Sequence, residues 1–440
     1  MRAIANVSTR MAERYLPDAF VLLAFLTLLV LAMGLLKGYQ PQEVLDFWSD
    51  GFFNLLEFTA QSTLVLVTGF ALAHTPLVKS GLVAFAKIPK NEVQVIALTT
   101  LVMMAASWFS WGFGLIAGAI VAREMGIVHR GKVHYPLVVA ASYAGFLVWH
   151  AGYGGAIPTL IATDGHFLSE TIGVIPVTET IFSSSTLIIL FGLAVVVPVT
   201  MVFMRPKNGD EIRSIPQSEI SASSDNDIKI STKDMTPAEK LESSRFIPLC
   251  FGVLAFASLV VYFYAGGVIN LNIVILSFFA LGLILTPSAS EYIKYFTGGA
   301  RSSYGIIMQF PFYGAIMGVM IQTGIAADIA QMFTYIATDK TLPFWGFISA
   351  GIVNIFVPSG GGQWAVQGPI MADAAANLNA DMARVAMAVA WGDAWTNMLQ
   401  PFWTLPLLAI AGLGIRDIMG YTAVVLVVSG VVIGSGLLFL

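Results

Sequence analysis

The chain is 440 residues long, and its composition is that of a membrane protein. Apolar residues make up 57% of the sequence and charged residues 11%, and the mean hydropathy is +0.80. This is too little polar surface to cover a soluble particle. The balance of 22 basic against 26 acidic residues excludes a strongly basic nucleic-acid-binding domain. The single cysteine, Cys250, excludes a disulfide framework and a thiolate metal cluster.

Apolar segments long enough to span a bilayer recur along the chain. A bilayer core about 30 Å thick needs roughly 20 apolar residues in a helix. Arg10, Glu13 and Arg14 precede the first segment, which favours a retained anchor over a cleaved signal peptide. We therefore expect an all-α integral membrane protein with spanning helices over residues 19–36, 58–73, 180–204, 246–265, 268–286, 303–322 and 419–440.

Four further apolar segments are interrupted near the middle. Residues 93–123 are broken at Ser110-Trp-Gly-Phe-Gly114, and residues 342–376 at Pro358-Ser-Gly-Gly-Gly-Gln363. Each half of these two segments has about 14 residues, or roughly 21 Å of helix, which is too short to cross. We therefore expect two re-entrant hairpins. The other two segments, residues 135–163 and 385–413, contain polar breaks and are expected to be single crossings that unwind partway.

The distribution of basic residues supports this topology. Cytoplasmic loops are enriched in Lys and Arg. With a cytoplasmic N-terminus and both hairpins re-entrant, 19 of the 22 basic residues fall on the cytoplasmic side, and the exceptions are Lys37, Lys340 and Arg384. If residues 93–123 crossed instead, the basic loop around Arg130 would face outward. We expect nine crossings and an external C-terminus.

The halves of the chain repeat one order of elements. A span, a hairpin, a broken crossing and a second span occur before and after a central polar segment. Ser110 and Ser359 are 249 positions apart, and Gly145 and Gly392 are 247 apart. An odd number of crossings separates the copies, so the second would be inverted, as in secondary transporters that bind substrate where broken helices meet. We expect halves over residues 1–205 and 245–440.

The central segment, residues 206–244, is polar and has no aromatic residue. Such a composition cannot bury a core, so we expect a flexible cytoplasmic linker. Near its end, Thr236-Pro-Ala-Glu239 has the form of a capping box with Pro at the first helical position. This motif predicts a short surface helix.

The hairpin tips are the main candidates for substrate binding. Where one helix ends and the next begins, unpaired N–H groups and the positive end of a helix dipole attract an anion. Successive glycines would let a ligand approach the backbone; the alternative is that they only permit a tight turn. The candidate substrate-binding residues are Ser110, Gly112, Gly114, Ser359, Gly360, Gly361, Gly362, Gln363, Asn397 and Gln400.

Few titratable residues lie inside the apolar segments, and each is costly to place there. Asp393 stands at a helix break near Thr396 and Asn397, an oxygen-rich set suited to ion coupling through H+ or Na+; an interhelical hydrogen bond is the alternative. His150 and Glu57 are secondary candidates for a functional role. The alternative for His150 is packing, and the alternative for Glu57 is a solvated carboxylate without a special role. No Lys or Arg lies in the expected spans, which favours a monocarboxylate held by neutral donors. No cofactor is expected, and no metal beyond a coupling Na+.

The motifs resemble those of the short-chain fatty acid transporter family, the acetoacetate and butyrate permeases of bacteria. They extend over nearly the whole chain and are Leu16-Pro-Asp18, Asp50-Gly-Phe-Phe-Asn-Leu-Leu56, Trp111-Gly-Phe-Gly-Leu115, Val357-Pro-Ser-Gly-Gly-Gly-Gln-Trp364 with Gln367-Gly-Pro369, Gln400-Pro-Phe-Trp403 and Ala409-Ile-Ala-Gly-Leu-Gly-Ile-Arg-Asp-Ile-Met-Gly-Tyr421. The resemblance implies short monocarboxylates as substrates and a location in the bacterial inner membrane.

The sequence departs from the family pattern at several candidate positions. The family tends to have Asn where Ser110 stands and more often Glu than Asp at Asp393. It has no acid at Glu57 and no imidazole at His150. These last two residues would then tune this member's specificity or pH response.

We expect a secondary transporter that moves acetoacetate- or butyrate-like acids together with a cation by alternating access. A carrier of dicarboxylates or other organic anions is the alternative within transport, and a passive anion channel is the alternative of another class. An enzyme is not expected, because the sequence has no intramembrane Ser/His set, Asp pair or His-rich metal site. The expected partners are a small carboxylate and membrane lipid, with a homodimer left open.

Overall fold

The structure is a computed structural model that describes residues 19–206, 212–216, 235–355, 357 and 359–440. These residues form helices and loops, with no β-strand in the described ranges. The all-α fold class expected from the composition is confirmed. The motif around Pro17 lies outside the described residues, as does Pro358.

The seven predicted spans correspond to seven long apolar helices. A mainly apolar segment can lie in lipid only if its backbone N–H and C=O groups bond to one another, which a helix achieves. The seven helices are α2 (Ala19–Leu36), α4 (Leu56–His74), α11 (Ser184–Phe203), α14 (Phe246–Tyr264), α15 (Leu271–Leu285), α17 (Tyr304–Gln322) and α23 (Ile415–Phe439). The bounds of α2 are those predicted, and those of the other six helices differ from the prediction by at most four residues at either end.

Both predicted hairpins are pairs of consecutive helices. The first consists of α6 (Glu92–Phe109) and α7 (Trp111–Val128), and the second of α19 (Leu342–Val353) and α20 (Gly360–Leu378). The expected arm length of about 14 residues is wrong for the first hairpin, because α6 and α7 have 18 residues each. By length and composition, α6 and α7 could each cross a membrane. Helix length therefore supports a re-entrant hairpin only for α19, which has 12 residues and is too short to cross.

Both predicted broken crossings are interrupted helices. In the first, α8 (Tyr135–Gly145) passes into the 3-10 helix η1 (Phe146–Ala151) and resumes as α9 (Ala156–Ile161). In the second, the elements are α21 (Met382–Thr396), the 3-10 turn η3 (Asn397–Leu399) and α22 (Pro401–Ala411). Pro401 stands at the first position of α22, where a missing N–H costs nothing.

Six shorter helices were not predicted as spans. Three of them, α3, α16 and α18, place polar residues along one face, as expected for helices at a water boundary. The capping box predicted at Thr236 is confirmed, since its hydroxyl accepts a hydrogen bond from the Glu239 N–H and the Glu239 carboxylate accepts one from the Thr236 N–H. The six are α3 (Pro41–Phe52), α5 (Pro76–Phe85), α10 (Ser169–Ile172), α13 (Pro237–Glu242), α16 (Ala289–Ser302) and α18 (Ile325–Ile336).

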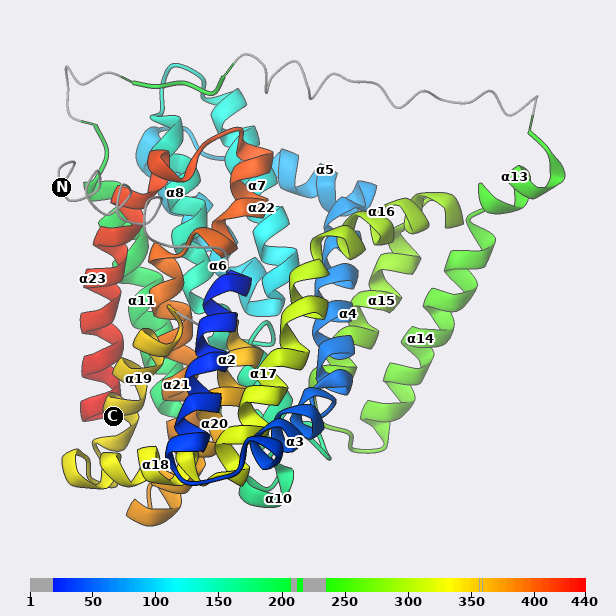
Figure 1. Cartoon of the computed structure of the whole chain (residues 1–440). Helices are drawn as coiled ribbons and strands as arrows, with labels where there is room; N and C mark the ends of the chain where they lie inside the picture. The colour runs from blue at the N-terminus through cyan, green and yellow to red at the C-terminus, as the bar shows by residue number, and fades with distance from the viewer. Residues whose placement is uncertain (1–18, 207–211, 217–234, 356, 358) are drawn as a thin grey trace.

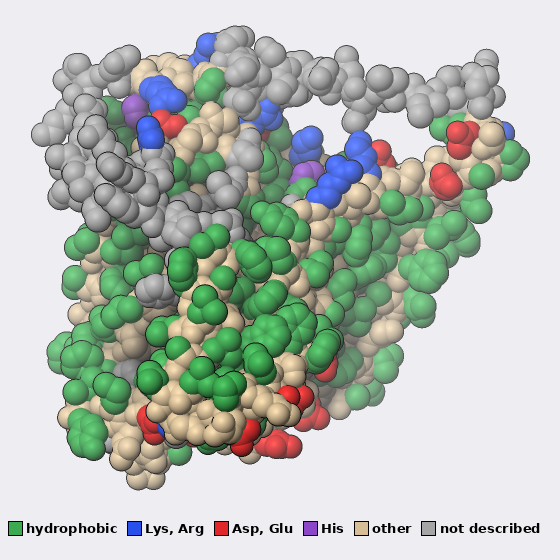
Figure 2. All heavy atoms as spheres, viewed as in Figure 1, with side chains coloured by type: hydrophobic (Ala, Val, Ile, Leu, Met, Phe, Trp, Pro, Cys, Tyr) green, Lys and Arg blue, Asp and Glu red, His purple; other side chains and the backbone are tan. Residues whose placement is uncertain are grey.

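The two ends of the bundle differ in charge. Figure 2 shows Lys and Arg side chains gathered near the end that carries α5 and α16, acidic side chains gathered near the opposite end, and hydrophobic side chains between them. Lys37 forms an ion pair with Asp328 at the second end. We call the first the basic end and the second the acidic end. Their assignment to the two sides of a membrane stays a prediction.

The hairpins enter the bundle from opposite ends. In Figure 1, α6 and α7 extend inward from the basic end, whereas α19 and α20 extend inward from the acidic end. The two hairpins therefore run in opposite directions, as the predicted inverted repeat requires. A duplication as the origin of this arrangement stays a prediction.

Part of the predicted linker is held against the bundle. The Tyr135 N–H donates to the Arg213 carbonyl at 2.8 Å, and the Arg213 guanidinium pairs with the Asp417 carboxylate. Ile215 is buried. A flexible linker over all of residues 206–244 is therefore wrong for residues 212–216, because a buried side chain and backbone hydrogen bonds fix them. Residues 207–211 and 217–234 lie outside the described part of the chain.

Candidate functional site

A small cavity lies where the hairpin tips and the broken helices meet. Its volume is about 20 Å³, which accommodates about one water molecule. Both hairpins, both broken helices and the spans α4 and α17 contribute to its wall. The lining residues are Ser62, Trp111, Trp149, Ala156, Ile306, Phe310, Ser359, Gly360, Gly361 and Trp403.

Residues from the first turns of α7, α20 and α22 line this central cavity. Trp111 is the first residue of α7, Gly360 is the first residue of α20, and Trp403 lies in the first turn of α22. The positive end of a helix dipole and its unpaired N–H groups favour a negative charge. None of the lining residues is charged. The cavity can therefore attract one carboxylate without a basic side chain.

The serines of both tips cap the helices that follow them. The Ser110 hydroxyl accepts from the Phe113 N–H, and the Ser359 hydroxyl accepts from the Gly362 N–H, each at 3.4 Å. These distances are long for hydrogen bonds, so each cap is weak. A ligand oxygen could compete with either serine for the N–H groups.

Tryptophan rings form the apolar wall of the cavity. The ring of Trp403 lies 5.2 Å from that of Trp111 and 5.8 Å from that of Trp149, measured between centroids. Trp149 also stacks on Phe146 at 5.6 Å. Aromatic faces of this kind suit a short hydrocarbon chain.

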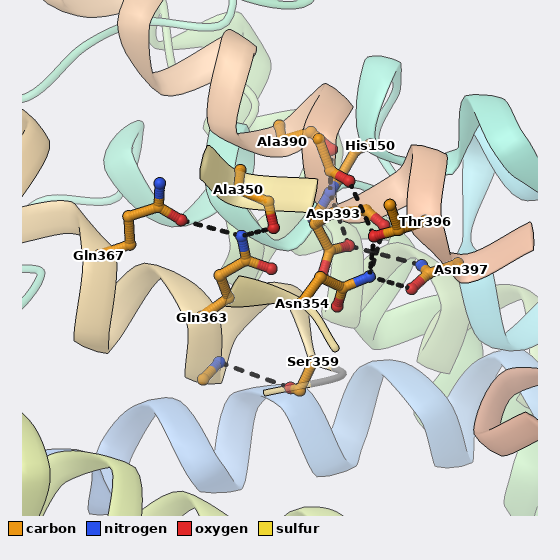
Figure 3. A network of polar contacts seen from close by, with 12 residues as sticks. His150, Ala350, Asn354, Ser359, Gln363, Gln367, Ala390, Asp393, Thr396 and Asn397 are labelled. Carbon is orange, nitrogen blue, oxygen red and sulfur yellow. Dashed lines mark hydrogen bonds and ion pairs between the residues drawn. The ribbon is translucent and has the colours of Figure 1, made fainter. Parts of the chain in front are cut away.

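A polar network surrounds the end of α19, next to the cavity (Figure 3). The Asn354 side-chain amide is placed to donate to the Asp393 carbonyl at 2.8 Å, to the Thr396 hydroxyl at 2.9 Å and to Asn397 Oδ1 at 2.8 Å. The Gln400 amide donates to the Asn354 carbonyl. The structure thus brings the predicted ion-coupling residues together around Asn354, which the sequence reasoning missed.

Asp393 and His150 form a fully buried pair. Asp393 Oδ2 lies 3.2 Å from His150 Nδ1, and both side chains are 0% exposed. His150 Nδ1 also lies 2.8 Å from the Ala390 carbonyl. With the proton on Nδ1, one N–H faces both acceptors, and Nε2 is left as an acceptor. The two halves of the chain therefore meet at this buried pair, and again where the Tyr143 hydroxyl donates to the Asn397 carbonyl at 2.7 Å.

Several buried oxygens of this network have no hydrogen-bond partner among the described residues. They are Asn354 Oδ1, Asp393 Oδ1, Gln400 Oε1 and Gln363 Oε1. Asn354 and Asn397 also stand at the C-terminal ends of α19 and α21, where helix dipoles are negative. Unpaired oxygens beside two negative helix ends favour a bound cation or a proton.

The glycines of the second tip lie under aromatic side chains. A Cβ added at Gly361 would come within 2.1 Å of the Phe58 ring, and one at Gly362 within 2.5 Å of the Tyr313 ring. At Gly360 it would meet the His150 ring at 2.4 Å. These glycines therefore permit close packing in this conformation, and a ligand could reach their backbone only if the rings moved.

The remaining candidates lie away from the cavity. Gly114 packs against Ser107 and Gly112 against Leu66, so both serve the close approach of helices. Gln363 donates to the Ala350 carbonyl and to Gln367 Oε1, each at 2.9 Å, and so joins the two arms of its hairpin. Glu57 is exposed in a second, polar cavity nearer the acidic end.

The sequence model of a family described as short chain fatty acid transporter matches residues 1–440. The chain belongs to this family. A protein of Escherichia coli (strain K12) named as a candidate short-chain fatty acid transporter is 41% identical over 436 residues, covering 99% of this chain and 98% of that protein. A protein of Haemophilus influenzae with the same name is 38% identical over 448 residues, covering 99% of each chain. The family and these relatives are transporters, not enzymes.

The fold is also similar to a solved one. The crystal structure of the YdaH transporter of Alcanivorax borkumensis, reported to have an unusual topology, gives a TM-score of 0.56 over 95% of this chain and 98% of that chain. The two sequences are 12% identical. At this identity the likeness concerns the fold alone.

Proposed function

We propose that this family member is a cation-coupled carrier of short monocarboxylates such as butyrate and acetoacetate, located in the bacterial inner membrane with the basic end facing the cytoplasm. The observation that carries the proposal is the convergence of three helix N-termini on one Trp-lined cavity without a basic residue. Helix ends supply about half a positive charge each, which suits one carboxylate. A dicarboxylate would need further donors for its second charge.

The coupling ion would bind in the network around Asn354. Its unpaired oxygens lie on side chains from both arms of the helix break, and the carboxylate of Asp393 supplies the negative charge. Asp393 also contacts His150 from the first half. A cation there would neutralise a buried charge and fix the second tip, whose Ser359 and Gly360 line the cavity. Ion and substrate would in this way stabilise one another.

Transport would proceed by alternating access. The central cavity holds about one water molecule, so the present conformation is closed around a space smaller than the substrate. Binding requires the hairpin tips and the aromatic rings over them to separate. Movement of the hairpins against the spans α4 and α17 would then expose the cavity to one side at a time.

The test is uptake by purified protein in liposomes. Labelled butyrate is supplied under an imposed Na+ gradient and, separately, under an imposed H+ gradient. We expect accumulation with one of the two ions and stronger competition by acetoacetate than by succinate. Uptake that only follows the butyrate gradient would indicate a channel, and preference for succinate would indicate a dicarboxylate carrier.

The role of Asp393 is tested in the same assay. Asp393→Asn removes the charge but keeps the size, and we expect accumulation to fall about tenfold or more, equivalent to losing about 1.4 kcal/mol of ion binding. Asp339→Asn, the same change at an exposed position of the acidic end, serves as the control. Accumulation by Asp393→Asn equal to that of the control would contradict the assignment.

A further inference from the structure

A polar cavity opens at the acidic end, close to the central one. Its volume is about 90 Å³, and the polar side chains of its wall are those of Asn54, Glu57, Gln61, Thr163, Asp164 and His166. Asn54, Glu57 and Asp164 are exposed to solvent. We call this cavity the vestibule. It is formed by the start of α4 and the loop that follows α9.

The side chain of Phe58 separates the vestibule from the central cavity. It lines the vestibule and is buried, with 4% of its surface exposed. Its ring covers Gly361, which lines the central cavity, and stacks on Phe310, another residue of that wall, with centroids 5.6 Å apart. Ser62, one helical turn further along α4, already faces the central cavity. One aromatic ring therefore lies between a solvent-exposed pocket and the candidate binding site.

The wall opposite Phe58 is fixed by hydrogen bonds. His166 Nε2 bonds to the Gly173 carbonyl at 2.9 Å, and its Nδ1 accepts from the Leu168 N–H at 3.3 Å. Burial lowers the pKa of His166, so the ring stays neutral and both nitrogens remain engaged. On the α4 side, the Gln61 amide donates to Asn272 Oδ1 at 3.0 Å. The Phe58 ring packs against the rings of Phe310 and Phe167, with centroids 5.6 and 6.1 Å away, and its displacement breaks no hydrogen bond.

We propose that Phe58 is the gate on the acidic side of the substrate site, and that the vestibule is the route by which a short monocarboxylate reaches the central cavity. This inference rests on the proposed function, since it assumes that the central cavity binds the substrate. Displacement of the ring uncovers Gly361 and the N-terminal turn of α20, so opening of the gate and exposure of the anion-binding backbone are one event.

Cysteine labelling tests the gate without requiring transport. In a Cys250→Ser background, Ser62→Cys is exposed to a polar thiol reagent in detergent-solubilised protein, where the reagent reaches both ends of the bundle. We expect Phe58→Ala to raise the labelling rate at least tenfold. Phe70→Ala, which removes a ring from the opposite end of the same helix where it stacks on His74, is the matched control and should leave the rate unchanged. Equal rates in the two variants would overturn the proposal.

A second variant covers the case in which Phe58→Ala folds poorly. Gly361→Ala leaves Phe58 intact but places a methyl group within 2.1 Å of its ring, so the ring must move aside and Ser62→Cys should again label faster. Unchanged labelling in a folded Gly361→Ala protein would also overturn the gate. Butyrate uptake by the unsubstituted protein is measured separately: if uptake is absent while Phe58→Ala still accelerates labelling, the proposed substrate fails and the gate stands.

Discussion

Asn354 is the residue on which the polar network around the second hairpin depends most. Its amide lies within 2.9 Å of three acceptors on the helix break of the second half. An amide has two N–H groups, so two of the three acceptors can be satisfied at a time. The third acceptor and the unpaired Oδ1 remain available to another ligand, which makes Asn354 both a structural link and a candidate ligand for the coupling ion.

Replacement of Asn354 should therefore affect stability as well as coupling. Asn354→Ala leaves buried acceptors without a donor, and an unsatisfied buried polar group costs about 1–3 kcal/mol. We expect a lower midpoint of thermal unfolding in detergent. Asn377→Ala, at an exposed position of α20 in the same hairpin, should leave the midpoint nearly unchanged. A similar midpoint for both variants would show that the network contributes little to stability.

At the scale of elements, the first hairpin depends on the close approach of its two arms. A Cβ added at Gly114 would lie 2.3 Å from the Ser107 hydroxyl and 2.7 Å from the Ser107 Cα. The second contact is with backbone, so rotation of a side chain cannot relieve it. The glycines of this segment were predicted to face a ligand, but at Gly114 the absence of a side chain is needed for packing of α7 against α6.

Gly114→Ala should force the arms of the first hairpin apart. Overpacking of this kind costs about 1–3 kcal/mol, and we expect a lower midpoint of thermal unfolding together with reduced butyrate uptake. The comparison is Gly81→Ala in α5, where a Cβ would meet nothing within 4 Å. There, higher helix propensity should stabilise the protein by up to about 1 kcal/mol. If Gly114→Ala is as stable as Gly81→Ala, the arms are not tightly packed.

For the whole molecule, the separation of charge between the ends predicts its orientation. The hairpin of α6 and α7 begins and ends at the basic end, and the hairpin of α19 and α20 begins and ends at the acidic end (Figure 1). Basic residues favour the cytoplasmic side. The proposed substrate site would then lie between one hairpin from each side of the membrane, which is the geometry that alternating access requires.

Labelling of single cysteines decides this orientation. In the Cys250→Ser background, Lys340→Cys should react with an impermeant reagent added outside intact cells, whereas Arg130→Cys should react only after the cells are opened. Both side chains are exposed in the structure, so a difference in reactivity reflects the side of the membrane. External labelling of Arg130→Cys would reverse the assigned orientation and place the vestibule on the cytoplasmic side.

The sequence by itself determined the composition of the membrane-spanning part, the positions of the helix breaks and the family. These properties follow from local hydrophobicity and from Gly, Pro and polar residues that stop a helix wherever they occur. The breaks expected near His150 and Asp393 are therefore where the structure has them. The arm length of the first hairpin was wrong, because a helix can continue through polar residues when neighbouring helices cover them.

Only the tertiary structure decided which residues share the site. Asn354 and Asp393 are 39 positions apart, and His150 and Asp393 are 243 apart, so neither contact leaves a periodic signal in the sequence. The same applies to Trp149 at the cavity and to Phe58 over Gly361. Such contacts depend on how helices from the two halves cross, and crossing is set by side-chain packing over the whole bundle rather than by any one segment.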